Sequence, residues 1–571
     1  LVEACGDTGR VIAARRTVPG KVGIVVGGGS GHEPAFYGYV GPGLADAVAI
    51  GNVFASPSPV QILEATRAAS QSAGVLYLYG NYSGDVMNFD MAAEQAADED
   101  ITVRTVLVTD DVASAPEDRR QERRGIAGGF FVFKVAAAAA DQFESLEGTV
   151  RLAAKANGHT RTMGVALSPC SLPHTLKYNF ELGADDMEIG MGIHGEAGIR
   201  RTRLASADAV TDELVEAILH NGFLSPGDEV ALLVNGLGST SLMELYLLNR
   251  RTRQILLDQG IGIHVTFVGE YVTSLEMAGA SISIMKLDDE LKRYLDHPCD
   301  TPALRIGNVS TLSTDSGSSS RRQTRRASSK GTAGNLSTHA LNDAGQAGDI
   351  SPTVFTAMML GIADSMHEHR DWLSSLDGVI GDGDHGVTMD IGWTAVASTL
   401  KSLEPGHDIG SISRLVGNTF LDAVGASCGP LYASGFLNAA KLLGDRLALD
   451  NQGMVDFISA MAEGIQLRGK AEAGDKTMVD AWLPARDQAR QALVTGADTE
   501  TCLRAALSGA EQGREATAGM VAVRGRSSKL GDRSLGHIDP GAASACLMLS
   551  AILEAYLEPG DRPATVVTNK D

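Results

Sequence analysis

The chain has 571 residues, more than one hydrophobic core normally supports, and therefore two to four domains are expected. No secretory signal is visible and no apolar run approaches the length needed to cross a bilayer, so a cytoplasmic protein is expected. The formal net charge of -22 argues against general binding to nucleic acids or membranes. Six scattered cysteines without a CxxC pair indicate reduced thiols and argue against a disulfide framework or a structural zinc site.

The first half of the chain alternates between β-branched apolar runs and alanine-rich helical stretches. Strands are predicted at 21–26, 75–78, 101–108 and 229–234. This alternation predicts an α/β fold in which helices cover both faces of a sheet, with functional residues at the strand ends. The chain opens at Leu1 without Met and enters its first strand quickly, as expected of a shortened N-terminus.

A glycine cluster at 27–31 follows the first of these strands, and His32 comes directly after it. Bare backbone amides can approach a polar ligand closely, although a tight turn explains the same residues equally well. The cluster matches neither GxGxxG nor a P-loop, so it predicts no dinucleotide or Walker-type site. His32 favours a site, because a loop imidazole can move protons near neutral pH. We expect a helix after this cluster.

Two further clusters carry an acid and a histidine. The segment 81–85 precedes a helix expected to begin near Met87, and Asp85 is either the N-cap of that helix or a general acid or base. The segment 187–198 has glycines on both sides of His194. A core histidine is normally packed among bulky neighbours, so this pattern favours a histidine with room for a ligand.

The chain changes character after the α/β half. Residues 312–350 are rich in Ser, Thr, Gly and Asn and predict a flexible linker. A nucleic-acid or regulatory contact by its basic run at 321–326 is the less favoured alternative. From 351 to 558, apolar residues at three- and four-residue spacing predict an all-α domain. The last segment, 559–571, has too few apolar residues to pack and is expected to fray.

Three carboxylates, Asp377, Asp382 and Asp384, lie within eight residues among glycines. Carboxylates this close repel one another, so one must be protonated or a cation must lie between them. Hard oxygen ligands favour Mg²⁺ over a transition metal. A magnesium site beside bare glycine backbone usually serves a phosphate group.

Several motifs together resemble the dihydroxyacetone kinase family over nearly the whole chain. GGGSGHEPA, GNVFASPS, NYSGDVMNF, GIHGE and NGLGSTS resemble its ketose-binding K domain, and LDxxxGDGDHG, GDKTMVDAWLP and GHIDPGA resemble its nucleotide-binding L domain. The resemblance implies a multidomain fold: a K domain of two α/β subdomains at 1–311, a linker at 312–350, an all-α bundle or barrel at 351–558, and a frayed tail at 559–571.

For the K domain, the resemblance implies that the ketose is held as a covalent hemiaminal on His194. A neutral imidazole can add to a ketone but not to an alcohol, so glycerol-like polyols would be rejected by chemistry rather than shape. His32 and Asp85 would be acid–base groups beside the reacting hydroxyl. The implied substrate-binding residues are Gly29, Ser30, Gly31, His32 and Asp85.

For the L domain, the resemblance implies that Asp377, Asp382 and Asp384 bind two Mg²⁺ ions bridging the phosphates of ATP. Metal charge of this kind supplies most of what phosphoryl transfer requires. The implied ATP-binding residues are His385, Gly425, Ser427, Cys428, Gly429, Asp539 and Gly541. ATP and Mg²⁺ are therefore the expected cofactors.

Two departures from the family pattern bear on the substrate. Gly80 stands where dihydroxyacetone-specific members usually carry Lys, which opens space for a ketose larger than a triose. Cys428 replaces a usual Ser and is a weaker hydrogen-bond donor to phosphate. The segment 41–59 is similar to the bacterial branch that acts on four-carbon ketoses such as erythrulose.

The expected function is ATP-dependent phosphorylation of a terminal hydroxyl of a short ketose, either dihydroxyacetone or D- or L-erythrulose. The expected assembly is a homodimer in which the two sites meet across subunits. One alternative is a lyase that cleaves FAD to cyclic FMN at the same metal–nucleotide site. Another is a non-catalytic ketose-sensing regulator, which the intact His194, Asp85 and metal aspartates disfavour.

Overall fold

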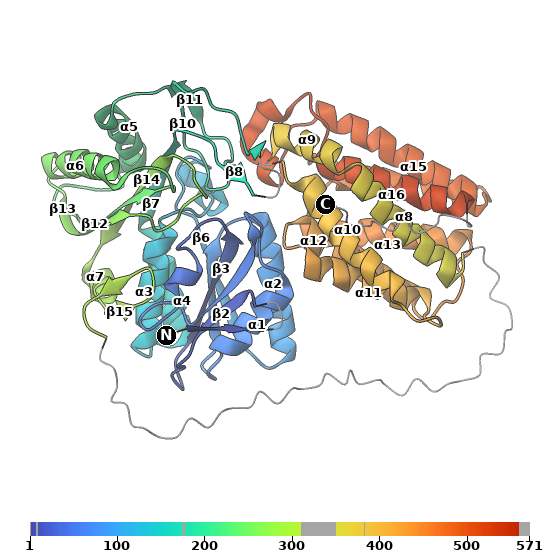
Figure 1. Cartoon of the computed structure of the whole chain (residues 1–571), viewed down its shortest axis with the longest axis horizontal. Helices are drawn as coiled ribbons and strands as arrows, with labels where there is room; N and C mark the ends of the chain where they lie inside the picture. Colours follow the sequence, from blue (N-terminus) through green and yellow to red (C-terminus); the bar gives the residue numbers. More distant parts are fainter. Residues whose placement is uncertain (1, 7–8, 174–176, 310–349, 382, 559–571) are drawn as a thin grey trace, which may run out of the picture.

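The computed structural model describes the chain except for residues 1, 7–8, 174–176, 310–349, 382 and 559–571. The described residues form an α/β K domain followed by an all-helical L domain, and the two lie side by side (Figure 1). This arrangement confirms the predicted fold class. The predicted linker, apart from Ile350, and the predicted tail lie outside the described residues, so the exact domain boundaries remain predictions.

The first sheet of the K domain has six strands in the order β1-β2-β4-β3-β5-β6. The last four run parallel, whereas β1 and β2 are antiparallel at one edge. Alternate residues of β3 face opposite sides: Val25 packs toward α1 and α2, and Ile24 packs toward α3 and α4. Helices therefore cover both faces, as predicted. The strands are β1 (Val2–Cys5), β2 (Val11–Ala14), β3 (Gly23–Ser30), β4 (Ala47–Val53), β5 (Val75–Gly80) and β6 (Val103–Val108); the helices are α1 (Pro59–Ala69), α2 (Ser83–Asp98), α3 (Gly129–Asp141) and α4 (Leu146–Gly158).

The second sheet has the order β11-β10-β7-β14-β12-β13. Only β12 and β13 pair in parallel among these described strands. One face packs against α5 and α6, and the other packs toward α3 and α7, so α3 is buried between the two sheets. The strands are β7 (Thr160–Ala166), β10 (Asp186–Ile189), β11 (Arg200–Arg203), β12 (Glu229–Gly236), β13 (Gly262–Gly269) and β14 (Gly279–Leu287); the helices are α5 (Ala207–Leu219), α6 (Leu242–Asp258) and α7 (Asp289–Leu295).

Short elements complete the K domain. Two small antiparallel pairs lie outside the main sheets, and three 3-10 turns connect larger elements. They are β8 (Ser171–Leu172), β9 (Lys177–Tyr178), β15 (Cys299–Asp300), β16 (Arg305–Ile306), η1 (Tyr37–Tyr39), η2 (Glu117–Glu122) and η3 (His220–Gly222).

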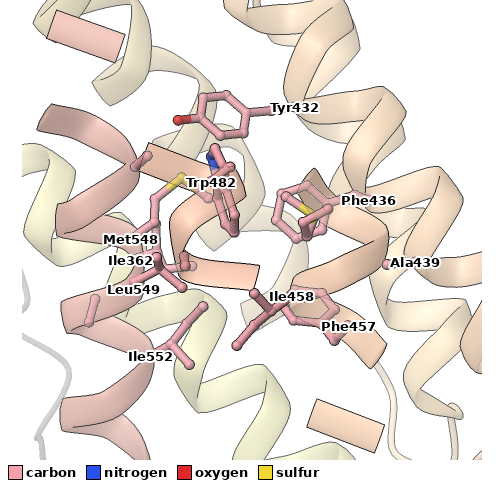
Figure 2. Packing of buried hydrophobic residues seen from close by; sticks show 14 of the residues in the cluster. Ile362, Tyr432, Phe436, Ala439, Phe457, Ile458, Trp482, Met548, Leu549 and Ile552 are labelled. Atoms are coloured by element: carbon pink, nitrogen blue, oxygen red, sulfur yellow. The ribbon is translucent and has the colours of Figure 1, made fainter. Parts of the chain in front are cut away.

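The L domain is a bundle of α-helices around one apolar core. Helices α11 and α12, α12 and α13, and α14 and α15 pack side by side, and α16 packs against α8. Figure 2 shows Trp482 of α14 among Tyr432 and Phe436 of α12 and Met548 of α16. The elements are α8 (Pro352–Glu368), α9 (Arg370–Ile380), α10 (His385–Lys401), α11 (Ile409–Ala423), α12 (Cys428–Leu443), α13 (Asn451–Gly469), α14 (Val479–Val494), α15 (Thr499–Ala516), η4 (Thr517–Gly519), η5 (Arg526–Ser534) and α16 (Pro540–Leu557).

One helix corrects the expectation that no apolar run is long enough to cross a bilayer. Helix α16 has 18 residues and a mean hydropathy of 1.4, which satisfies that length and composition test. However, 67% of it is buried inside the protein, and residues such as Met548 belong to the core shown in Figure 2. The apolar character of α16 is explained by its position in the bundle.

All six cysteines are free.

Two local predictions were wrong. The glycines at 27–29 are not in a loop: they continue strand β3, because Phe36 and Phe89 pack so closely on Gly28 and Gly27 that no side chain would fit there. A loop and the turn η1 follow, rather than the expected helix. Helix α2 begins at Ser83, not near Met87, so Asp85 lies within its first turn and is not its N-cap.

Candidate active site

The two domains enclose one large cleft of about 1740 Å³. K-domain residues including Asp85 and His194 line it together with Asp377 and Asp384 of the L domain. Both groups of predicted site residues therefore face one shared space within a single chain. The expectation that the sites meet across subunits is not needed to bring them together.

Contacts between α2 and the L domain hold the cleft together. The side-chain amide of Asn88 donates a hydrogen bond to the carbonyl oxygen of Gly425. Arg468 pairs with Glu94 at 3.1 Å, and Met91 joins a small apolar cluster with residues of α11 and α12. At Gly425, any side chain would overlap the backbone of the K domain, so glycine is required where the domains touch.

His194 lies in the loop after β10 and is only 6% exposed. Its Nδ1 is 2.9 Å from Oε1 of Glu196, and its backbone N–H donates to the other oxygen of the same carboxylate at 3.0 Å. A carboxylate accepts hydrogen bonds, so Nδ1 carries the proton and Nε2 carries the lone pair. Such a nitrogen can act as a nucleophile toward a carbonyl carbon.

Glu196 is in turn part of a buried ion-pair chain. Nη1 of Arg124 lies 3.9 Å from Oε2 of Glu196, and its guanidinium pairs with Asp111 at 2.8 Å. Arg124 also donates to the carbonyl oxygen of Gly190, at the start of the His194 loop. Burial raises the pKa of Asp111, and Arg124 opposes that increase. The chain thus fixes both the loop and the carboxylate that orients His194.

His32 is the second buried histidine of this site. Its Nδ1 is 2.8 Å from the carbonyl oxygen of Thr273, so Nδ1–H donates and Nε2 carries the lone pair. Its ring stacks on Phe54 at 5.1 Å and meets the His194 ring edge-on at 4.8 Å. Asp85 is 8% exposed and lines the same cavity as both histidines. The structure therefore brings together the three predicted catalytic residues.

The predicted glycine-loop residues differ in position. Gly29 lines the cleft. The Ser30 hydroxyl donates to the carbonyl oxygen of Gly51 at 2.9 Å, and the Gly31 N–H donates to Glu33 at 3.0 Å. These two residues are engaged within the protein and do not line the described cavities.

The acidic site of the L domain lies at the junction of α9 and α10. Oδ2 of Asp377 accepts hydrogen bonds from the backbone N–H groups of Asp384 at 3.0 Å and His385 at 3.2 Å. Burial, together with the charge of Asp377, raises the pKa of Asp384 to about 7. Asp382 lies outside the described residues. The donor set of carboxylate oxygens fits Mg²⁺, since a divalent cation would remove the penalty that these like charges impose on each other.

Five α-helix N-termini meet the cleft. They belong to α2, α10, α12, α14 and α16, and residues from the first turns of all five line it. Helix N-termini present unpaired N–H groups and partial positive charge, which favours phosphate oxygens. Of the predicted ATP-binding residues, the lining ones are His385, Ser427, Cys428, Asp539 and Gly541. Gly425 and Gly429 do not line it, and Gly429 packs against the backbone of Val424.

Three of these lining residues have shifted pKa values, and burial lowers the pKa of His385. Burial raises the pKa of Asp539 to about 7, although its carboxylate caps α16 by accepting from the N–H of Ala542 at 2.8 Å. Burial also raises the pKa of the Cys428 thiol well above its usual range. The thiol therefore stays protonated and can offer only a weak hydrogen bond.

One cationic side chain of the cleft is bonded to the backbone of the L domain. Lys476 also lines the cleft, but its ammonium donates to the carbonyl oxygens of Thr517, at 2.6 Å, and His537. Burial lowers its pKa. Lys476 thus fixes the loop before Asp539, and within the part of the chain that the structure describes it forms no salt bridge with an acidic residue.

Sequence reasoning missed four residues of this site. Glu196, Arg124, Phe54 and Tyr82 orient or surround His194, and the Tyr82 ring meets its imidazole edge-on at 4.8 Å. The position of Glu196, two residues after His194 in a glycine-rich loop, could have indicated that its carboxylate contacts the imidazole. The contribution of Arg124 could not be predicted in this way, because Arg124 lies 70 residues before His194 in the chain.

A buried pair of histidines that shares one cleft with a cluster of buried carboxylates is the arrangement expected of a two-substrate transferase. Models of the Dak1 domain and the DAK2 domain match residues 1–303 and 379–554, respectively. The chain belongs to the dihydroxyacetone kinase family and joins both of its domains in one polypeptide. It is a kinase.

Similar proteins cover almost the whole chain. The D-erythrulose kinase of Mycolicibacterium smegmatis is 38% identical over 550 residues, which are 96% of this chain and 93% of that protein. The L-erythrulose 1-kinase of the same organism is 36% identical over 556 residues, 96% of this chain and 94% of that protein. The crystal structure of the dihydroxyacetone kinase of C. freundii with AMP-PNP and Mg²⁺ is 26% identical, covers 97% of this chain and 95% of its own, and gives a TM-score of 0.50.

Proposed function

We propose that this protein transfers the γ-phosphoryl group of ATP to a terminal hydroxyl of a short ketose, with a ketotetrose such as D- or L-erythrulose preferred over dihydroxyacetone. The observation that carries the proposal is the single cleft lined by His194, Asp85, Asp377 and Asp384. The similarity to two erythrulose kinases supports the tetrose.

The K domain would bind the ketose covalently. The lone pair on Nε2 of His194 attacks the ketone carbon as the C=O π bond breaks, and the resulting alkoxide oxygen takes up a proton from water to complete a hemiaminal. Attack leaves positive charge on the imidazole ring. The carboxylate of Glu196, 2.9 Å from Nδ1, is placed to stabilise that charge.

The bound ketose would present one terminal hydroxyl to the cleft. Asp85, in the first turn of α2, is the proposed base that accepts the hydroxyl proton as the oxygen attacks the γ-phosphorus. His32 is held through Nδ1 by the backbone of Thr273. It is the proposed acid–base partner that orients this hydroxyl, because the lone pair on its Nε2 can accept a hydrogen bond from it. Both groups lie in the cavity that contains His194.

The L domain would bind the nucleotide. Asp377, Asp382 and Asp384 are the proposed ligands of Mg²⁺, which would neutralise charge on the triphosphate and on the transferring group. The N-termini of α10, α12 and α16 would then donate N–H groups to phosphate oxygens. Ser427, with Cys428 beside it, would line the phosphate-binding turn.

A homodimer and a cytoplasmic location are also proposed. An exposed apolar stripe on α6, comprising Leu242, Met243, Tyr246 and Leu247, supports an interface in the K domain. The FAD-cleaving lyase and the sensor remain the alternatives. The described site gives a reason to prefer the kinase over both: a lyase does not need His194, and a sensor does not need the acidic site facing it.

The test is ATP consumption coupled to detection of sugar phosphate by the purified chain. Dihydroxyacetone, D-erythrulose, L-erythrulose and glycerol are compared, with FAD as a separate substrate. We expect turnover with ketoses, highest with an erythrulose, and none with glycerol. Ketose-independent cleavage of FAD without sugar phosphate would refute the kinase and support the lyase.

A further inference from the structure

Helix α2 carries the proposed base at its start and contacts the L domain further along. Asp85 lies in its first turn, and Asn88, Met91 and Glu94 follow at intervals of three residues. Residues three apart in an α-helix lie on the same face. The last three contact the L domain through a hydrogen bond, an apolar cluster and an ion pair, respectively. One face of α2 thus connects the base to the domain that carries the acidic site.

Asn88 is the contact closest in sequence to Asp85. Its side chain is fully buried, and its amide donates a hydrogen bond to the carbonyl oxygen of Gly425 in the L domain. Its other polar atom, Oδ1, has no hydrogen-bond partner among the described residues. A buried amide normally has its hydrogen bonds satisfied, so the bond across the interface is what orients this side chain.

The backbone that Asn88 contacts begins the predicted phosphate-binding turn. Gly425 leads into Ser427, which lines the cleft just before α12. The first turn of α2 lies directly on this segment, because a methyl group added at Gly84 would lie 3.4 Å from the backbone nitrogen of Ser427. A methyl group added at Gly425 would overlap the carbonyl oxygen of Ser56 in the K domain. Glycine on both sides therefore lets the two domains touch beside the proposed base.

We propose that Asn88 is a positioning residue for phosphoryl transfer, which fixes the phosphate-binding turn relative to Asp85. The inference rests on the proposed function. Asp85 and Asn88 lie about one turn apart on a rigid helix, so the bond to Gly425 sets the distance between the base and the phosphate groups that the turn would hold. The attacking oxygen must approach phosphorus in line with the leaving oxygen, and a misplacement of about 1 Å can cost about 10²-fold in rate.

The first test removes the amide. Asn88→Ala keeps the helix, because alanine is the best helix former. We expect kcat for ketose phosphorylation to fall about ten- to 100-fold, because the reacting groups are no longer held in register. The affinity for Mg²⁺-ATP, measured by calorimetry, and ketose binding, followed by NMR, should remain as in the unaltered protein. An unchanged kcat, or a loss of either binding step, would overturn the proposal.

The matched control is Asn451→Ala, at the start of α13. There the same kind of bond lies within the L domain, since the Asn451 amide donates to the carbonyl oxygen of Ala497 at 2.8 Å. We expect this variant to unfold at a lower temperature with an unchanged kcat. Equal losses of kcat in both variants would show that Asn88 acts through general stability, and would overturn the proposal. No turnover of any ketose by the unaltered protein would instead refute the proposed function.

The second test moves the turn from the opposite side. The methyl group of Gly425→Ala meets the carbonyl oxygen of Ser56, which belongs to the other domain, so the turn must move away from the K domain while α12 can still fold. Gly425 itself does not line the cleft, so we expect Mg²⁺-ATP binding to be retained and kcat to fall at least about 100-fold. Gly158→Ala, at the end of α4, meets no atom within 4 Å and is the control. A Gly425→Ala protein with an unchanged kcat would overturn the proposal.

Discussion

The two halves of the cleft solve the problem of buried polar groups in opposite ways. In the K domain, each charged residue behind His194 has an internal partner: Glu196 lies between His194 and Arg124, and Arg124 pairs with Asp111. In the L domain, burial and the charge of Asp377 disfavour the ionised form of Asp384, and the nearby Lys476 is bonded to backbone carbonyls. The ketose site is preformed, whereas the nucleotide site requires a cation from outside.

This difference matches the chemistry proposed for each half. A nucleophilic addition depends on one nitrogen held in one tautomer and one direction, which a rigid network supplies. Phosphoryl transfer depends mainly on neutralising charge, which a metal supplies together with the nucleotide. The comparison predicts that the K domain binds its ligand without the L-domain ligands, and that the L domain is sensitive to metal and pH.

The largest effect is expected from His194→Ala. Without the imidazole no hemiaminal can form, so kcat/KM for ketoses should fall by at least about 10³-fold. The measurement is coupled ATP turnover, with Mg²⁺-ATP binding followed by calorimetry. His367→Ala, at an exposed histidine of α8, is the control. Full turnover in His194→Ala would remove the covalent anchor from the account.

Asp384→Asn should nearly abolish Mg²⁺-dependent ATP binding, because an amide is a poorer ligand for a hard cation. We expect activity to fall roughly 10²- to 10³-fold while ketose capture by the K domain remains. Nucleotide binding is measured by calorimetry and ketose binding by NMR. Asp487→Asn, at an exposed site in α14, is the control. Normal Mg²⁺-ATP affinity in Asp384→Asn would contradict the metal assignment.

Glu196→Gln tests whether the carboxylate beside His194 sets the tautomer of its imidazole. The amide can donate to Nδ1 and so favour the tautomer in which Nε2 carries the proton, which is the wrong form for attack. We expect kcat/KM for ketoses to fall roughly 100-fold with unchanged Mg²⁺-ATP binding. Glu147→Gln, an exposed residue of α4, should have no effect. A loss of nucleotide binding would mean that Glu196 supports the fold rather than the imidazole.

The smallest effect concerns stability without metal. The pKa values of Asp384 and Asp539 are both raised to about 7, so the folded state holds protons that the unfolded state releases near pH 4. The contribution of these two groups to the stability of the metal-free protein should therefore be complete below about pH 4, be lost as the pH rises to about 7, and change little above that. Mg²⁺ with ATP should flatten this dependence. Thermal unfolding followed by circular dichroism measures it, and a metal-free protein more stable at pH 8 than at pH 6 would contradict the L-domain half of the comparison.

Much of the fold could be predicted from the sequence, because strands β3, β5, β6 and β12 are strong apolar runs and the L domain has clear helical spacing. His194, Asp85 and Asp377 could also be located, because each lies near glycines at the end of a predicted strand or helix. Local geometry was less predictable. Three glycines at 27–29 indicate a turn by composition, but tertiary packing against Phe36 and Phe89 makes them strand.

The supporting partners of the site could not be predicted from spacing. Arg124 and Asp111 reach the His194 loop only because the fold brings the segment after β6 beside the loop after β10. Likewise, no local pattern indicates that Lys476 bonds to backbone carbonyls instead of the acidic residues. Contacts between segments far apart in the chain depend on tertiary structure, and a single sequence does not encode them in any local pattern.

The most direct test is carbon NMR of dihydroxyacetone labelled with ¹³C at its ketone carbon, bound to the full-length protein without metal or nucleotide. The account predicts that the ketone signal of the bound ligand is replaced by that of a tetrahedral carbon, and that His194→Ala abolishes this change. A bound ligand that keeps its ketone signal, or that becomes tetrahedral only when Mg²⁺-ATP is added, would contradict a preformed covalent site in the K domain.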